Sequence, residues 1–410
     1  MKRTKNSITL GIDNMVQEMR NYKFRLYPTI KQEELLVNNI NVCRWVYNKF
    51  IEYSKKGSVS QFDLNYYLTE LKQQEPWLNN YHSKMLQMVS TQISGSQKGL
   101  KVLKKNGRKT GNLRFARYGE YRTFTYNQSG FKIENEKLTL SKIGNIKIKQ
   151  HRDIQGKIKQ VIITKTKSGK WYACATCELN QIPLPMIDLF KAVGIDVGIK
   201  NFAYDSDGFV TPNPMNLKKL LKPLVRVQRK MARRKFGSNN YLKAKKWYQI
   251  IHERIANRRK DFHHKLSTIY AKKYDVIVVE KLNLTGMVKN HHLSRSIMDS
   301  GWGGFLQKLE YKTKMLIEVD PRNTTVDCSR CGNNVPKTLA IRTHQCNTCG
   351  LTLDRDHNAS INILQKIIPQ ELRKSTPVEI SKRSMTQEAH GFSRWVVHYG
   401  IKNLIGEINE

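Results

Sequence analysis

Two cysteine pairs of the same form constrain the fold of this chain more than any other feature of its sequence. Cys328 and Cys331 make one CxxCG motif, Cys346 and Cys349 make the other, and fourteen residues separate the two pairs. Four thiolates at this spacing can surround one Zn²⁺ tetrahedrally, and the glycine after each pair permits a tight turn. An ion closed by four cysteines keeps no open position for a reactant, so we predict one structural zinc site.

The other three cysteines do not predict a second metal site. Cys43 falls on the apolar face of an expected helix, which makes it a core residue. Cys174 and Cys177 lie three apart in an alternating strand, where their side chains point to opposite faces. Since no export signal is visible at the N-terminus, the cysteines are expected in a reducing compartment, and a cytoplasmic protein is predicted.

The charge balance indicates the class of partner. The chain has 72 Lys and Arg residues against 33 Asp and Glu residues, a formal net charge of +39 and a pI near 10.0. Such an excess favours binding to a long polyanion, because each neutralised phosphate releases counterions. Ribosomal and chromatin proteins share this excess, so charge alone predicts a nucleic acid partner and no reaction. No apolar run of about 18 residues is present, and no membrane partner is expected.

The hydrophobic period divides the first half of the chain. Residues 1–30 are expected to be an extension followed by a first strand, and Thr29 with Gln32 fits a capping box that opens a helix. Residues 31–105 predict a helical domain. Residues 106–185 alternate with a period of two, which predicts antiparallel strands in a small barrel or sandwich. The expected strands cover residues 122–126, 130–133, 137–140, 146–149, 160–165 and 171–178.

The second half has the pattern of an α/β domain. Residues 186–327 contain a hydrophobic hairpin, long basic helices and buried strands, residues 328–350 hold the cysteine pairs, and residues 351–370 end the domain. Residues 371–410 are expected to be a C-terminal tail. Between residues 217 and 265 the helices combine one apolar side with dense Lys and Arg, so a basic side is free to follow phosphates.

Three acidic positions interrupt otherwise apolar elements. Asp196 lies in an expected strand between glycines, and Glu280 ends a continuous apolar run that fits a buried strand. The third position lies in Asp354-Arg355-Asp356, and spacing does not decide between its two aspartates. One such carboxylate is more often a cap or an ion-pair partner, but three together are costly unless cations neutralise them. Two Mg²⁺ ions would do so and would support two-metal phosphodiester hydrolysis.

Further candidates are residues of the expected strands and helices that could contact nucleic acid. These are Tyr53, Arg122, Thr123, Tyr126, Arg233, Arg234, Arg258 and Arg259. Four histidines lack metal-ligand spacing and are expected at the surface or against nucleic acid: His263, His264, His291 and His292.

These motifs together resemble the TnpB family, the RNA-guided nucleases of insertion sequences, which are related to the type V CRISPR effectors. The resemblance runs through most of the chain and lies in residues 24–29, 44–48, 124–131, 151–152, 194–198, 279–283, 328–350 and 354–359. The cysteine pairs followed by the DRDxNA motif are its most specific part. The chain departs from the family pattern at Ser360, where alanine is common, and at residues 324–326, where Ser-Gln is frequent.

The resemblance implies a multidomain α+β protein with an RNase H-like (RuvC) nuclease core into which the zinc finger is inserted. The strands of residues 106–185 would be a β-barrel wedge domain, and the helices of residues 31–105 a recognition domain. It selects Asp356 as the third member of a metal-binding catalytic triad with Asp196 and Glu280. It further implies a transposon-encoded guide RNA, cleavage of double-stranded DNA beside a short transposon-adjacent motif, and a monomer bound to RNA.

Three alternative functions differ from this one in what they require of the sequence. A guide-dependent DNA-binding repressor should have lost an acidic residue of the triad, and all three are present. A compact type V CRISPR effector would carry the same chemistry and differ in its genomic neighbourhood. A transposase catalysing strand transfer would need a nucleophilic tyrosine or serine constellation, and none is evident in the sequence.

Overall fold

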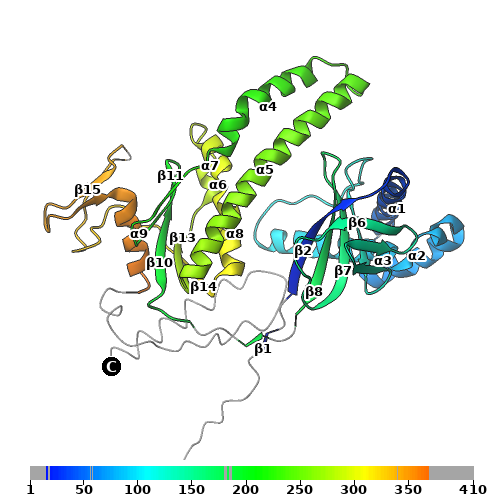
Figure 1. Cartoon of the computed structure of the whole chain (residues 1–410), viewed down its shortest axis with the longest axis horizontal. Coiled ribbons are helices and arrows are strands. Elements are labelled where there is room, and N and C mark those ends of the chain that lie inside the picture. The colour runs from blue at the N-terminus through cyan, green and yellow to red at the C-terminus, as the bar shows by residue number, and fades with distance from the viewer. Residues whose placement is uncertain are drawn as a thin grey trace, which may run out of the picture. The chain divides into compact units, whose positions relative to one another are not determined.

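The fold is described from a computed structural model of the 410-residue chain (Figure 1). The described residues are 15–16, 19–55, 57, 59–179, 182–183, 187–338 and 340–368. The chain forms two compact units, Met1–Pro183 and Leu184–Glu410, and each is described by itself. The predicted C-terminal tail and the first fourteen residues of the predicted extension lie outside the described residues.

Four helices are described in the first unit, and the first of them begins with the capping box that the sequence predicts. They are α1 (Ile30–Ser54), α2 (Gln61–Gln74), the 3₁₀ helix η1 (Pro76–Asn80) and α3 (Ser83–Lys105). Thr29 Oγ1 accepts from the backbone N–H of Gln32 at 3.3 Å, and Gln32 Oε1 accepts from the backbone N–H of Thr29 at 3.1 Å. The predicted capping box is therefore confirmed, and Ser60 with Asp63 makes a second one at the start of α2.

The strands of the first unit form a seven-stranded antiparallel sheet in the order β3-β7-β8-β2-β6-β5-β4. They are β2 (Met19–Tyr27), β3 (Thr123–Asn127), β4 (Phe131–Glu134), β5 (Lys137–Leu140), β6 (Gly144–Lys149), β7 (Lys157–Lys165) and β8 (Trp171–Glu178). A separate pair joins β1 (Met15–Val16) to β9 (Ile182–Pro183). The order is that of an open sheet with edges β3 and β4, so the closed barrel stays a prediction.

One hydrophobic core joins the helices of the first unit to its sheet. Phe24 of β2, Phe50 of α1 and Met85 of α3 are all fully buried in it. Cys43 is buried in the same core, as predicted. Cys177 is buried and Cys174 is half-buried, which agrees with the prediction that they point to opposite faces of β8.

The second unit is built on a five-stranded mixed sheet in the order β12-β11-β10-β13-β14. Its strands are β10 (Ala192–Val197), β11 (Asn201–Asp205), β12 (Val210–Pro212), β13 (Val276–Glu280) and β14 (Met315–Val319). β10, β11 and β12 are antiparallel neighbours, whereas β13 and β14 run parallel to β10. The carboxyl ends of β10, β13 and β14 therefore lie at one edge of the sheet.

Helices cover both faces of this second sheet (Figure 1). Residues of α5 (Asn239–Lys273), α7 (Ser294–Ser300) and α8 (Trp302–Lys312) pack on one face, and residues of α9 (Arg355–Gln365) pack on the other. The unit also contains α4 (Asn216–Ala232), which packs on α5, and the short helix α6 (Leu284–Met287). Val193 packs in a cluster with Phe305 of α8, while Val278 packs in the opposite cluster with Ile363 of α9. No helix within the described ranges is long and apolar enough to cross a membrane.

A small cysteine module lies between β14 and α9. It contains the hairpin of β15 (Thr343–Gln345) and β16 (Thr352–Asp354), which pair antiparallel. Cys328, Cys346 and Leu351 form its own small buried cluster. The mixed helix and strand content and the four-cysteine cluster predicted from the sequence are thus confirmed.

Candidate carboxylate site and cysteine cluster

Asp196 and Glu280 come from adjacent parallel strands and end at the same edge of the sheet. Ile195 of β10 is in register with Val279 of β13, so the two acidic residues follow a paired position. Because side chains alternate along a strand, Asp196 shares a face with Gly194, and Glu280 shares a face with Val278. That is the face covered by α9, since Val278 packs in the cluster with Ile363.

Asp356 reaches this edge from the first turn of α9. Asp354 is the N-cap residue and accepts from the backbone N–H of Asp356 at 2.8 Å, which starts the helix here. Helix α9 lies very close to β10. A Cβ atom at Gly194 would be only 2.2 Å from the carbonyl oxygen of Ser360. A Cβ atom at Gly198 would lie 4.0 Å from Asp356 Oδ2, so this carboxylate is next to the end of β10.

Burial and neighbouring charge both affect the carboxylates at this edge. Burial raises the pKa of Asp196 well above its ordinary value, and the negative charges of Glu280 and Asp356 raise it further. Burial also raises the pKa of Glu280, against the opposing effects of a hydrogen bond from Thr324 and the charge of Lys366. Such a cluster favours a neutralising cation.

The side chains of Arg355 and Arg342 both form ion pairs with the Asp356 carboxylate. Arg355 donates from Nη2 to Asp356 Oδ1 at 3.1 Å, and Arg342 donates from Nη1 to Oδ2 at 3.4 Å. Arg342 belongs to the cysteine module, just before β15. The module therefore contributes a cation directly to the edge that carries the carboxylates.

The four predicted zinc ligands come together in the structure. The Sγ atoms of Cys328, Cys331, Cys346 and Cys349 all lie within 4.8 Å of one another, the one such group of Cys, His, Asp or Glu donors found among the described residues. Two of the Sγ pairs are 3.5 and 3.6 Å apart. Four sulfurs about 2.3 Å from one Zn²⁺ would be roughly 3.8 Å apart, so the donors fit this ion.

The glycines of the two knuckles have the backbone conformation that the motif predicts. Gly332 and Gly350 have φ values of +73° and +72°, which side chains rarely permit. Their N–H groups donate to the carbonyl oxygens of Cys328 and Cys346 at 2.8 and 2.9 Å.

The predicted nucleic-acid contacts differ in how exposed they are. Tyr126 was predicted wrongly, because its side chain is fully buried and its hydroxyl donates to the carbonyl oxygen of Ser141 at 2.8 Å. Tyr53 is half-buried, and its ring stacks on that of Tyr67 with the ring centroids 4.2 Å apart. Arg122 and Thr123 are half-buried at the start of β3, where Arg122 Nε donates to the carbonyl oxygen of Gly119.

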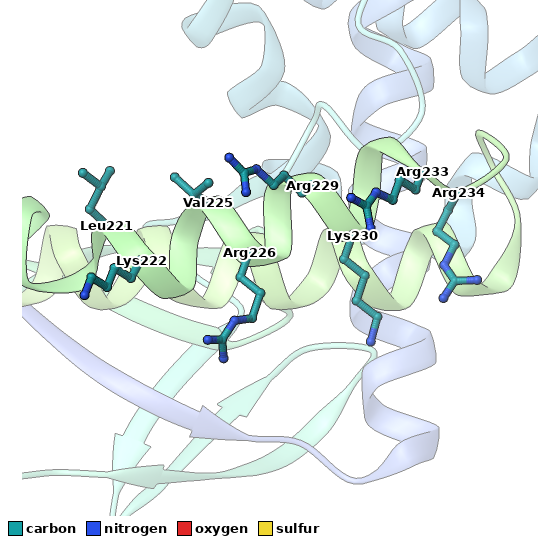
Figure 2. Close-up of a pocket in the computed structure, with 8 residues that line it drawn as sticks. All are labelled: Leu221, Lys222, Val225, Arg226, Arg229, Lys230, Arg233 and Arg234. Carbon is teal, nitrogen blue, oxygen red and sulfur yellow. The ribbon is translucent and has the colours of Figure 1, made fainter.

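The predicted basic contacts of the second unit divide in the same way. Arg258 is exposed on α5, whereas Arg259 is half-buried and donates to the carbonyl oxygen of Met298. Arg233 and Arg234 are exposed at the end of α4. They belong to a groove of about 970 Å³ on α4 (Figure 2), lined by Leu221, Lys222, Val225, Arg226, Arg229, Lys230, Arg233 and Arg234.

The surface prediction for His263 was wrong. Its side chain is 3% exposed and packs between aromatic rings of α5, α8 and β11, while Nε2 is 2.8 Å from the carbonyl oxygen of Ser300. Its position on α5 four residues from Arg259 gave no signal of this burial, because the surrounding sequence is basic. The sequence also did not predict the role of Thr324, Asn358 and Asn362, whose hydrogen bonds hold the segments that carry the site.

Comparison with known proteins relates the chain to insertion-sequence proteins. Family models match it as "Probable transposase" over residues 184–291, "Cas12f1-like, TNB domain" over residues 302–363 and "Helix-turn-helix domain" over residues 15–57. Within its described residues, the last segment contains β1, β2 and one helix, α1.

Two relatives extend over nearly the whole chain. "Putative RNA-guided DNA endonuclease InsQ" of Escherichia coli (strain K12) is 30% identical over 85% of this chain and 92% of its own length. A "Putative RNA-guided DNA endonuclease" of Streptomyces pristinaespiralis is 31% identical over 85% of this chain and 90% of its own length. The solved structure titled "Cryo-EM structure of the Cas12f1-sgRNA-target DNA complex" is 13% identical, with a TM-score of 0.47, and covers 86% of this chain and 99% of its own.

The fold and the site define a protein of two compact units. In the second unit, acidic residues lie at one edge of the sheet, and a four-cysteine module precedes the last described helix. The chain belongs to the TnpB family.

Proposed function

We propose that this protein is an RNA-guided DNA endonuclease. It would bind a transposon-encoded guide RNA and cleave double-stranded DNA next to a short transposon-adjacent motif. Membership of the TnpB family supports this function, as do the names of relatives that match over 90% or more of their length. The observation that carries the nuclease assignment is the convergence of Asp196, Glu280 and Asp356 from three distant segments on one sheet edge.

An RNase H-like (RuvC) core is the fold that we assign to the second unit. Three antiparallel strands continued by two parallel strands, in the order β12-β11-β10-β13-β14, are the arrangement expected of such a core. The cysteine module before α9 agrees with a zinc finger inserted in that core. Its zinc would be structural, because all four ligand positions are filled by cysteine.

Asp196, Glu280 and Asp356 would hold two Mg²⁺ ions. Burial, followed by the negative charges of Glu280 and Asp356, raises the pKa of Asp196, so a bound cation would be favourable here. When bound, such ions activate a water molecule and stabilise the leaving oxygen of a phosphodiester. The chain's own contribution is to fix two carboxylates on rigid strand ends and the third on a capped helix. Arg342 and Arg355 add positive charge where a substrate phosphate would lie.

The basic side of α4 would hold the nucleic acid against this core. Lys222, Arg226, Lys230 and Arg234 are spaced four residues apart and extend from one side of α4, opposite Leu221 and Val225 (Figure 2). Four residues of helix rise about 6 Å, so the three cations within α4 form a line about 12 Å long, and Arg234 follows after the helix ends. A line of cations without an acidic residue among the groove's lining is suited to successive phosphates of one strand.

The first unit would bind the guide RNA. We assign residues 31–105 to a helical recognition domain and residues 106–185 to a wedge domain, with a monomer of the protein bound to RNA. Lys23 lies 4.4 Å from the ring centroid of Tyr172, and Arg25 lies 5.1 Å from it, so cations and an aromatic ring alternate on the sheet. Surfaces of this composition bind nucleic acid backbones.

The experiment that tests the proposed function is sequencing of the RNA that copurifies with the protein. We expect one defined RNA that runs into transposon-end sequence, and Mg²⁺-dependent cleavage of DNA that matches its guide. Bulk ribosomal or transfer RNA would count against the proposal. Binding of guide-matched DNA without cleavage, under conditions where Mg²⁺ is saturating, would favour the repressor instead.

A further inference from the structure

One side of α9 carries a polar stripe that binds the connector between β14 and the cysteine module. Asn358, Asn362 and Lys366 follow one another at intervals of four residues, so they lie on one side of the helix. We call residues 320–327 the connector. Lys366 Nζ donates to the carbonyl oxygens of Asp320 and Arg322, both at 2.6 Å. The stripe thus fixes the backbone where β14 ends.

The middle of the stripe fixes the connector next to Glu280. Asn362 Nδ2 donates to the carbonyl oxygen of Thr324 at 2.8 Å and to that of Asp327 at 2.7 Å. Thr324 is 1% exposed, and its hydroxyl donates to Glu280 Oε1 at 2.5 Å. The same hydroxyl lies 3.0 Å from the carbonyl oxygen of Pro321. The hydroxyl has one proton and both neighbouring oxygens are acceptors. The contact with Glu280 is the shorter of the two, so the proton is directed toward the carboxylate.

The start of the stripe fixes the first cysteine knuckle. Asn358 is fully buried, and its Nδ2 donates to the carbonyl oxygen of Asp327 at 2.8 Å. Its Oδ1 accepts from the backbone N–H of Ser329 at 2.9 Å, inside the pair formed by Cys328 and Cys331. Both the nitrogen and the oxygen of the Asn358 side-chain amide are therefore hydrogen-bonded. Since Asn358 is two residues after Asp356, the position of the knuckle is linked to the start of α9.

We propose that Thr324 is a positioning residue for Glu280 and that the polar stripe of α9 couples the cysteine cluster to the carboxylate site. Cys328 would be held in place when the four cysteines bind zinc, and the hydrogen bond between Ser329 and Asn358 links this position to α9. The connector, held by Asn362, then directs the Thr324 hydroxyl at one oxygen of Glu280 and orients the carboxylate for a cation. Groups that orient metal ligands in this way commonly change metal affinity or activity by about 10- to 100-fold when removed. This inference rests on the proposed metal-dependent nuclease function.

Three variants of the full-length protein with its RNA test the positioning role. Thr324→Val removes the hydroxyl and keeps the volume, Thr324→Ser keeps the hydroxyl, and Thr325→Val makes the same change at an exposed neighbour. We expect Thr324→Val to keep one zinc per chain and its RNA affinity, and to lose about 10- to 100-fold in cleavage rate at limiting Mg²⁺. Thr324→Ser should restore most of the rate, and Thr325→Val should match the unchanged protein.

Affinity for Mn²⁺ in the absence of DNA, measured by calorimetry, separates this inference from the proposed function. Weaker Mn²⁺ binding by Thr324→Val than by Thr324→Ser supports the positioning role even if no guided DNA is cut, in which case only the proposed function fails. Equal Mn²⁺ affinity and equal Mg²⁺ dependence of all variants would overturn the positioning role. Should Thr324→Val fail to fold, a folded Thr324→Ser variant that binds Mn²⁺ weakly would overturn it as well.

Hydrogen exchange of the unchanged protein tests the coupling. Removal of zinc by a chelator should increase exchange in the first turns of α9 and in the connector, while α1 and α3 of the first unit keep their protection. Unchanged protection of α9 after complete loss of zinc would overturn the coupling, whatever the variants show.

Discussion

A Cβ atom at Gly194 of β10 would lie 2.2 Å from the carbonyl oxygen of Ser360 in α9. This separation is far below van der Waals contact, so a glycine is needed for the helix to lie this close to the strand. Asp196 is two residues beyond Gly194, and Asp356 is four residues before Ser360. The close approach therefore determines how near the two carboxylates can come.

Substitution of Gly194 should damage stability and cleavage together. We expect Gly194→Ala to destabilise the second unit by about 1–3 kcal/mol through overpacking, and to reduce guided cleavage because α9 is displaced. Denaturant unfolding and a cleavage assay measure the two effects. Gly99→Ala is the control, since a Cβ atom at this helical position meets nothing within 4 Å, and it should stabilise by about 0.4–1 kcal/mol. A Gly194→Ala protein with unchanged stability would contradict this packing.

The metal-free protein should be more stable without the Asp196 carboxylate at neutral pH. The folded-state pKa of Asp196 is raised, so the unfolded chain gives up this proton more readily than the folded one. Stability is therefore lost as the pH rises from the ordinary aspartate value through the raised one. Asp196→Asn should have the higher unfolding temperature near pH 7 without divalent ions, and the difference should shrink toward pH 4. A lower unfolding temperature for Asp196→Asn at pH 7 would refute the raised pKa of Asp196.

Loss of one cysteine ligand should act on cleavage through geometry. Cys346→Ser is expected to lose zinc and to reduce cleavage, with the first unit still folded, because the cluster holds the module together. Zinc analysis, circular dichroism and a cleavage assay check this expectation. Asp356→Ala is the comparison, since it should keep zinc and fold normally but not cut. If Cys346→Ser lacks zinc and still cuts normally, the cluster has no role in catalysis.

Neutralising the line of cations on α4 should weaken nucleic acid binding in a salt-dependent way. We expect the combined change Lys222→Gln, Arg226→Gln and Lys230→Gln to reduce the slope of log affinity against log salt by about 2–3, since each phosphate contact contributes roughly 0.7–0.9. Fluorescence titration of RNA at several salt concentrations measures the slope. The charge-keeping set Lys222→Arg, Arg226→Lys and Lys230→Arg should retain it. Equal slopes for the two sets would exclude this groove as a phosphate contact.

Local patterns in the sequence predicted the elements well. The strands at Lys137–Leu140 and Trp171–Glu178 have the predicted bounds, because alternation and turn residues determine strand limits locally. The capping box at Thr29 and the position of Glu280 at the end of an apolar run were predicted for the same reason. Four cysteines of fixed spacing predicted their own cluster.

Features that depend on which face is buried, or on contacts between distant segments, could not be predicted. Alternation places Tyr126 on a face without saying that this face is inward, and its hydroxyl is satisfied by a carbonyl group fifteen residues away. His263 lies in a basic stretch but points into an aromatic cluster. The hydrogen bonds of Asn358 and Thr324 reach 29 to 44 residues along the chain, so no local pattern indicated them.

Cleavage by Asp196→Ala tests the central claim most directly. The unchanged protein and the variant, each loaded with the same guide RNA, would be mixed with guide-matched double-stranded DNA at saturating Mg²⁺. Product formation and RNA affinity would be measured in parallel. We predict RNA binding equal to that of the unchanged protein and no detectable cleavage. Cleavage by Asp196→Ala at the rate of the unchanged protein would contradict the assignment of the carboxylate site.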